Sequence, residues 1–182
     1  MSRLAPLEPA KLTAEQKKVY DDILAGPRGG IGGPFAAWLR SPALADRAQK
    51  LGEFCRFNTS LPKRLSELAI LMTARHWTAQ FEWYAHARMA REAGLADAVI
   101  EAIRVRQRPA AMADDEAAIY DFCNEAYALH RVTDQTYARA VALFGEPTVV
   151  ELVGVIGYYC LVSLTLNVFR MPLPEGEKEQ LK

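Results

Sequence analysis

The chain has 182 residues, 51% of them hydrophobic, and its 22 basic and 22 acidic side chains cancel to a formal net charge of zero. This length and composition predict a single domain with a sizeable core, and the lack of a clustered basic surface argues against a nucleic-acid partner. Cys55, Cys123 and Cys160 are odd in number and far apart in sequence, which argues against a secreted disulfide framework and for a cytoplasmic protein. Buried, unreactive thiols are the default interpretation of all three.

Helix signals follow one another along the chain without a strand or hairpin pattern, so the sequence predicts an all-α fold. Thr13, with a glutamine three residues later, forms a capping-box signature. The glycines and prolines of 26–34 predict a loop, either a flexible lid or a plain connector. Asp114 or Asp115, and later Asp134, are the expected N-caps of two further helices. The predicted helices cover 13–24, 34–40, 41–54, 62–72, 78–94, 96–106, 114–127, 134–143 and 147–168.

The longest apolar run, 149–168, approaches the length of a membrane span. Glu151 and Asn167 interrupt it, and carboxylates inside a membrane are costly, so we interpret it as a buried core or subunit-interface helix and expect no membrane association. No basic start followed by an apolar stretch marks a signal peptide. The domain is expected to span the whole chain, with its core over 12–176 and a loose charged tail at 177–182.

Two carboxylates and a histidine lie within an otherwise apolar stretch, at Glu67, Glu82 and His86. Acidic side chains are rarely buried without a partner or a function. Glu82 and His86 are four residues apart, so they share one face of a helix and can touch. Two interpretations stay open. One is a helix pair that contributes roughly a few tenths of a kcal/mol; the other is an acid–base site in which Glu82 orients His86 and burial raises the pKa of Glu67.

Glu67, the run 82–86 and the helix end 93–95 resemble the carboxymuconolactone decarboxylase family, which includes the alkylhydroperoxidase D proteins. The segment 157–176 resembles the C-terminal end of longer family members, so the resemblance covers residues 12–176. It implies an all-helical, alkylhydroperoxidase D-like bundle. It also implies assembly into a homo-oligomer, as a dimer, trimer or hexamer.

The peroxidase branch of that family carries a Cys-x-x-Cys-x-x-x-His motif, and counting back from His86 places its two cysteines at Ala79 and Glu82. Neither position holds a thiol, so disulfide-cycle peroxide reduction is not possible at this site. Glu67 and His86 match the family's glutamate and terminal histidine. Acid–base chemistry is therefore the natural function of what remains.

The resemblance implies a decarboxylase-like enzyme that acts on a small cyclic or lactone carboxylic acid, needs no metal or cofactor, and uses Glu67, Glu82 and His86 for catalysis. Because such a substrate is anionic, cationic side chains should line its pocket. The candidate substrate-binding residues, with Arg56 as a further cation, are Arg75, His76, Trp83 and Arg170. An inter-helix packing role is the alternative for His76. Two other functions stay open: antioxidant activity of the alkylhydroperoxidase type, and ligand binding by a non-catalytic oligomer.

Overall fold

Helices account for all the regular structure in the computed structural model, which describes residues 2–182, and no strand occurs among those residues. The all-α prediction is therefore confirmed. A 3₁₀ turn (Pro9–Lys11) precedes the first helix, and a π-helical turn (Phe54–Asn58) continues the third. The helices are α1 (Ala14–Ala25), α2 (Phe35–Trp38), α3 (Pro42–Glu53), α4 (Lys63–His76), α5 (Gln80–Glu92), α6 (Asp97–Arg104), α7 (Asp114–Leu129), α8 (Asp134–Phe144) and α9 (Glu146–Phe169).

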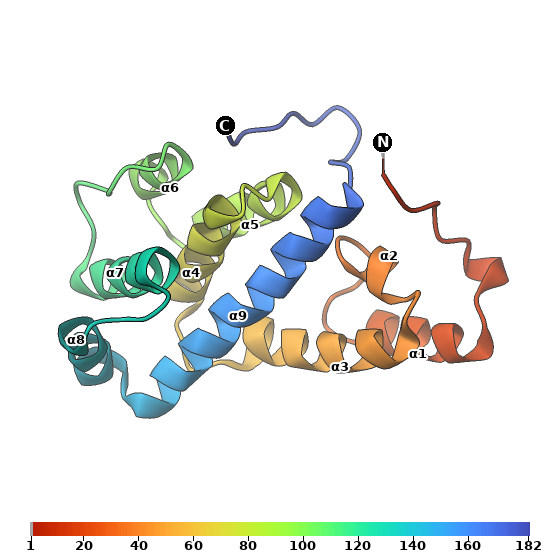
Figure 1. The fold of residues 1–182 in the computed structure, drawn as a ribbon, viewed down its shortest axis with the longest axis horizontal. Coiled ribbons are helices and arrows are strands. Elements are labelled where there is room, and N and C mark those ends of the chain that lie inside the picture. The colour runs from red at the N-terminus through yellow and green to blue at the C-terminus, as the bar shows by residue number, and fades with distance from the viewer. Residues whose placement is uncertain (1) are drawn as a thin grey trace.

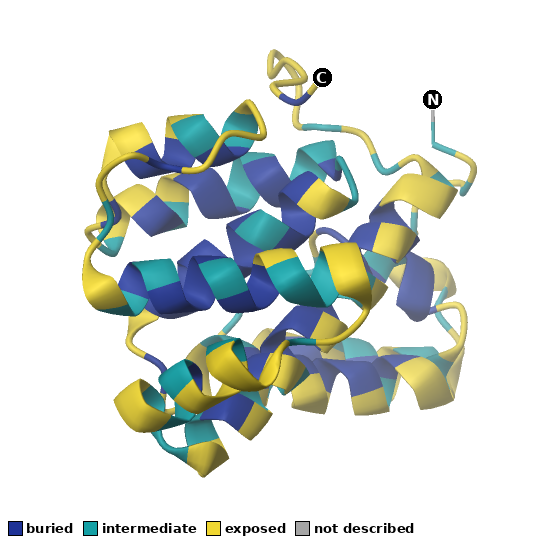
Figure 2. Ribbon diagram, turned by 60° about the vertical axis from the view of Figure 1, so that its left-hand side comes forward, coloured by how far each residue is buried: buried dark blue, intermediate teal, exposed yellow. Residues whose placement is uncertain are grey.

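The centre of the fold is α4, because it is surrounded by other helices on almost every side. Every residue from Leu65 to Leu71 is at most 2% exposed, as expected of a helix that is apolar nearly all round. The neighbours of α4 are α5, α7 and α9, with α6 at a smaller contact. In Figure 1, α9 runs obliquely, with α4 and α5 on one side and α1 to α3 on the other. The buried faces of the helices turn toward this centre (Figure 2), and one hydrophobic cluster extends from α1 to α9.

Local sequence signals place several helix ends where they were expected. The hydroxyl of Thr13 accepts a hydrogen bond from the Gln16 amide at 3.2 Å, and the Gln16 side chain accepts one from the Thr13 amide at 3.0 Å, which confirms the capping box. Gly94, with φ of +90°, follows the end of α5. The segment 26–34 is a loop between α1 and α2, as predicted.

The aspartate N-caps predicted for α7 and α8 are wrong. The N-cap of α8 is Thr133, whose hydroxyl accepts from the helix backbone, and Asp134 is the first helical residue. The N-cap of α7 is Ala113, and its amide donates to the Glu116 carboxylate at 2.9 Å. Asp114 lies inside the first turn. In the first turn a carboxylate interacts favourably with the positive end of the helix dipole. Aspartate is therefore favoured there as well as at the N-cap, one position earlier.

By length and composition α9 could cross a membrane, but 56% of its most apolar window is buried inside the fold. It serves as a core helix of the fold, with Leu152, Tyr159 and Leu166 among its buried residues. Its outer face keeps an exposed apolar stripe. The residues of this α9 stripe are Val150, Val153, Leu161, Leu164 and Val168.

The segment after α9 has no regular structure, yet it is attached to the helices, contrary to the expectation of a loose tail over 177–182. The Gln80 side chain donates to the Leu181 carbonyl at 2.7 Å and accepts from the amides of Leu181 and its predecessor at 3.0 Å. Arg75 donates to the main-chain oxygen of Lys182 at 2.5 Å, and Leu181 is only 5% exposed. The tail therefore covers the corner between α4 and α5.

Candidate active site

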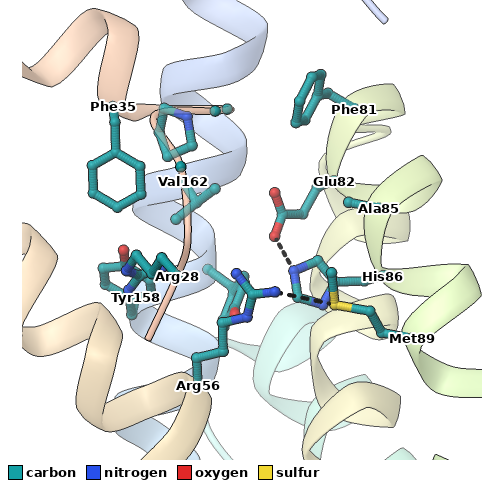
Figure 3. Close-up of a pocket in the computed structure, with 15 residues that line it drawn as sticks. Arg28, Phe35, Arg56, Phe81, Glu82, Ala85, His86, Met89, Tyr158 and Val162 are labelled. Carbon is teal, nitrogen blue, oxygen red and sulfur yellow. Dashed lines mark hydrogen bonds and ion pairs between the residues drawn. The ribbon is translucent and has the colours of Figure 1, made fainter. Parts of the chain in front are cut away.

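The three predicted catalytic residues meet where α4 packs against α5. His86 Nδ1 lies 2.6 Å from Glu67 Oε2, and His86 Nε2 lies 3.0 Å from Glu82 Oε1. Each of the three residues is at most 4% exposed. Glu82 and His86 are one helical turn apart on α5, whereas Glu67 reaches across from α4. Figure 3 shows the Glu82 carboxylate pointing at the imidazole ring.

His86 is held as an imidazolium. Both ring nitrogens face carboxylate oxygens, and both can donate only when the ring carries two protons. Burial acts to lower the pKa of His86, but the charges of Glu82 and Glu67 and their hydrogen bonds outweigh it and raise that pKa to about 9. At neutral pH the ring is therefore positively charged and is an acid, not a base.

The expectation that burial raises the pKa of Glu67 is wrong. Burial does act in that direction, but the positive charge and hydrogen bond of His86, together with Lys63, outweigh it and lower the pKa below its ordinary value. Lys63 Nζ lies 2.7 Å from the second Glu67 oxygen. Because the Lys63 side chain is 47% exposed, the row Lys63–Glu67–His86–Glu82 joins the protein surface to the interior.

Tyr159 packs edge-on against the imidazole of His86, with ring centroids 5.1 Å apart. Burial, with the nearby charges of Glu82 and Glu67, raises the pKa of this phenol well above its ordinary value. Tyr159 therefore remains neutral. It shields the imidazolium from water on the α9 side without competing for its proton.

A cavity of about 300 Å³ opens beside Glu82 and His86. Its wall comes from the glycine loop, the start of α2, the π-helical turn, α5 and α9, so the loop 26–34 forms part of the site and is not a plain connector. Apart from the glycines and the charged residues, the wall consists mostly of aromatic and aliphatic side chains. The cavity is lined by Arg28, Gly30, Gly32, Gly33, Pro34, Phe35, Arg56, Phe81, Glu82, Ala85, His86, Met89, Tyr158, Tyr159 and Val162.

Two arginines in this cavity have no carboxylate within ion-pair distance anywhere in residues 2–182. The guanidinium of Arg28 lies 4.9 Å from the centroid of the Phe35 ring. The guanidinium of Arg56 lies 5.0 Å from the centroid of the Phe57 ring and donates weakly to Met89 Sδ at 3.4 Å. Their charges are thus available to an anionic ligand. In Figure 3, Arg56 lies beside His86, whereas Arg28 lies farther away, beside Tyr158.

Gly52 leaves the space that the side chains of Arg28 and Tyr158 occupy. A Cβ at position 52 would collide with the Tyr158 hydroxyl and ring and with the Arg28 guanidinium. The glycine is therefore required by close approach of side chains from the loop and from α9, and not by its own backbone conformation.

The four predicted substrate-binding residues lie outside the cavity. Arg75 and His76 line a separate hollow at the end of α4. Trp83 is 1% exposed and belongs to the core, and Arg170 lies in a surface hollow beside the tail. The arginine that sequence reasoning missed is Arg28, because an irregular glycine-rich loop gives no periodicity from which to infer its direction. Arg56, named from its neighbourhood alone, does line the cavity.

The positions that match the thiol pair hold a buried Ala79, at the N-cap of α5, and the carboxylate of Glu82. Cys55 and Cys123 are buried elsewhere, and burial raises the pKa of their thiols to about 11 and about 12. Such thiols are poor nucleophiles at neutral pH. Within residues 2–182, no three His, Cys, Asp or Glu side chains are grouped so as to hold a metal ion.

No protein-family model matches the chain, and no curated protein matches it either. A solved structure from Ralstonia eutropha JMP134, described as an alkylhydroperoxidase AhpD core and an uncharacterized peroxidase-related protein, aligns at TM-score 0.77 and 14% identity, covering 96% of this chain and 93% of its own. A protein of unknown function from Agrobacterium tumefaciens, named as a candidate antioxidant defence protein AhpD, aligns at TM-score 0.66 and 17% identity, covering 79% of this chain and 99% of its own. Identities this low establish architecture alone: the chain has the AhpD-like all-α fold that its sequence predicted.

Proposed function

We propose that the protein is an acid–base enzyme that transfers a proton to a small cyclic or lactone carboxylic acid, as a lyase of the carboxymuconolactone decarboxylase type. The observation that supports this most directly is the buried imidazolium of His86, held between two carboxylates in the wall of a cavity that also contains Arg28 and Arg56. A preorganised acid beside unpaired cations suits an anionic substrate that must be protonated.

The positions of Arg28 and Arg56 in the cavity favour a separate role for each arginine. An arginine beside the substrate carboxylate contributes to binding, whereas one beside the lactone carbonyl stabilises the negative charge that develops during reaction. Because Arg56 lies beside His86 and Arg28 lies farther off, we assign Arg56 to the reacting end and Arg28 to the distal anionic end (Figure 3). The aromatic rings of Phe35, Phe81 and Tyr158 suit a flat ring between them.

The proposed reaction is a decarboxylation followed by protonation at carbon. The bond from the ring carbon to the carboxylate breaks, carbon dioxide leaves, and the electron pair moves into the conjugated lactone. The resulting dienolate takes a proton at carbon from the His86 imidazolium, which becomes neutral. Glu67 does not line the cavity, so we assign it the role of positioning His86. Lys63, at the solvent side of Glu67, is the group through which a proton returns to His86.

The experiment is direct assay of carbon dioxide release and of the change in substrate absorbance, with carboxymuconolactone as first probe and other small lactone acids after it. Wild type should turn over at least one probe, and His86→Gln should lose turnover while keeping its helical circular dichroism. Arg88→Gln is the matched control, because Arg88 lies on the exposed side of α5 and pairs only with Glu92 at 3.6 Å. Unchanged turnover in His86→Gln contradicts the proposal. A ligand-induced rise in Tm without turnover of any probe favours non-catalytic binding instead.

Peroxide reduction is the second candidate, because one solved structure is described as an alkylhydroperoxidase AhpD core and the other as a candidate antioxidant defence protein. It would have to use cysteines other than a Cys-x-x-Cys pair. Peroxide consumption with a dithiol reductant should be compared in wild type and in a variant with Cys55, Cys123 and Cys160 all replaced by Ser. Consumption that is lost in the variant favours the antioxidant function, and consumption absent from both favours acid–base chemistry.

A further inference from the structure

A second hollow, of about 130 Å³, lies at the far end of α4 from Lys63. It is bounded by the last turn of α4, the segment after α6, and α7. It shares no residue with the cavity beside His86. Its lining is Met72, Arg75, His76, Ile103, Arg106, Gln107, Tyr120, Asn124 and Tyr127.

This hollow carries excess positive charge. Arg75 and Arg106 both donate to the hydroxyl of Thr78, each at 3.2 Å, so two guanidinium groups of like charge converge on one neutral oxygen. No carboxylate side chain lies within ion-pair distance of either arginine in the part of the chain that the structure describes. Arg75 also donates to the main-chain oxygen of Lys182, but its Nε is buried without a partner. Burial and the charges of Arg106 and Arg104 lower the pKa of Arg75.

The backbone is strained at Thr78 and at Arg106, one of the two arginines that donate to the Thr78 hydroxyl. Thr78 has φ of +48° and Arg106 has φ of +61°, in the left-handed region that residues with a side chain rarely adopt. For a β-branched residue such as Thr78 this conformation is particularly unfavourable. Strained residues of this kind persist where the surrounding structure holds them, and they concentrate at functional sites. Here the strain places one hydroxyl between two arginines.

We propose that this hollow binds a small oxyanion, a phosphate or carboxylate group, through Arg75 and Arg106. A bound oxyanion would accept from both guanidinium groups and separate their like charges. Gln107 and Asn124 also line the hollow, and their side-chain amides can donate to an oxyanion. The volume suits a single anionic group and is too small for a drug-sized ligand.

His76 forms the side of the hollow and provides an internal reporter. Its ring stacks on Tyr127, with centroids 4.4 Å apart and planes 13° from parallel. Burial, Arg106 and His130 lower its pKa. An anion bound beside it counters the arginine charge and should therefore raise that pKa.

The test uses inorganic phosphate as the probe, at low ionic strength, with Tm and the NMR-detected titration of His76 as readouts. In wild type, phosphate should raise both Tm and the His76 pKa. Arg106→Gln, at an exposed position, should weaken phosphate binding about tenfold or more. Arg28→Gln is the control, because it removes a cation from the cavity beside His86 and should leave the His76 response unchanged.

A phosphate response that persists in Arg106→Gln, or that is absent from wild type, overturns the proposal. So does a response lost in Arg28→Gln and kept in Arg106→Gln, which would place the anion in the other cavity. Repeating the titration with acetate separates the two anion chemistries. Stronger binding of phosphate identifies a phosphate site, and stronger binding of acetate identifies a carboxylate site.

Discussion

His86 is a charged residue whose protonation is tied to folding. Its pKa of about 9 lies above the ordinary value of 6.5, so between these values the folded chain binds a proton that the unfolded chain lacks. Its contribution to the free energy of unfolding is fully present below about pH 6.5 and is lost as the pH rises through about 9. The loss should be on the order of 3 kcal/mol.

Urea unfolding from about pH 6 to about pH 10 would measure this loss. Glu67→Gln removes one of the two carboxylates that raise the pKa of His86, so in that variant the fall in stability should be smaller and should end at a lower pH. A wild-type stability that stays flat over this range would show that folding does not raise the pKa of His86.

Arg28 and Arg56 make separable contributions under the proposed function. Arg28→Gln should raise KM for an anionic lactone by about tenfold or more, through loss of a charge-assisted hydrogen bond. Arg56→Gln should lower kcat by a similar factor, because it removes charge stabilisation at the reacting end. Steady-state kinetics measure both.

Arg47→Gln serves as the control, since Arg47 lies on the exposed side of α3 and donates only to the Ala43 carbonyl. Equal changes in KM for the Arg28 and Arg56 variants, with kcat unaltered, would remove the distinction between the two roles.

The three proposed catalytic residues lie together as the sequence predicted, whereas the four proposed substrate-binding residues lie outside the cavity. Glu82 and His86 are four residues apart, and that spacing alone brings them together on a helix. Trp83 follows Glu82 directly, but successive residues of an α-helix point about 100° apart, so it faces the core. Arg28 approaches Tyr158 from a distant part of the chain, and no local pattern encodes such a contact.

At the scale of elements, Gly52 sets how closely α3 approaches α9. Gly52→Ala should lower the free energy of unfolding by about 1–3 kcal/mol, because the added methyl group displaces Tyr158 and Arg28. Gly154→Ala is the matched control: a Cβ there meets nothing within 4 Å, so the helix should gain about 0.5–1 kcal/mol. Urea unfolding measures both variants, and equal effects would show that α3 can shift without penalty.

The helix pattern was predictable because its signals are local, as in the capping box at Thr13 and the positive-φ glycine after α5. The docking of the tail was not. Gln80 bonds to Leu181 across most of the chain, and a charged, proline-containing segment gives no sign that its backbone will be held. The π-helical turn that carries Arg56 was likewise not predicted: the predicted helix ended at residue 54, and one extra residue per turn changes no residue type.

At the scale of the whole molecule, the α9 stripe predicts self-association. Its residues repeat at intervals of three, four and eight, so they lie along one side of the helix, and contiguous exposed apolar surface of this kind is typical of interfaces. Leu164→Glu should shift the mass measured by light scattering toward that of the monomer. Leu129→Glu, at an exposed leucine on α7, should not. A wild-type protein that is already monomeric would contradict the prediction.

The missing side chain at Gly52 also has an evolutionary consequence. The side chains of Tyr158 and Arg28 occupy the space that a Cβ at position 52 would need. The residue types at positions 52 and 158 are therefore coupled. A larger residue at position 52 costs less stability once the side chain at position 158 has become smaller, so substitutions at 158 should tend to come first. Related chains with a side chain at position 52 should therefore carry a small residue at position 158.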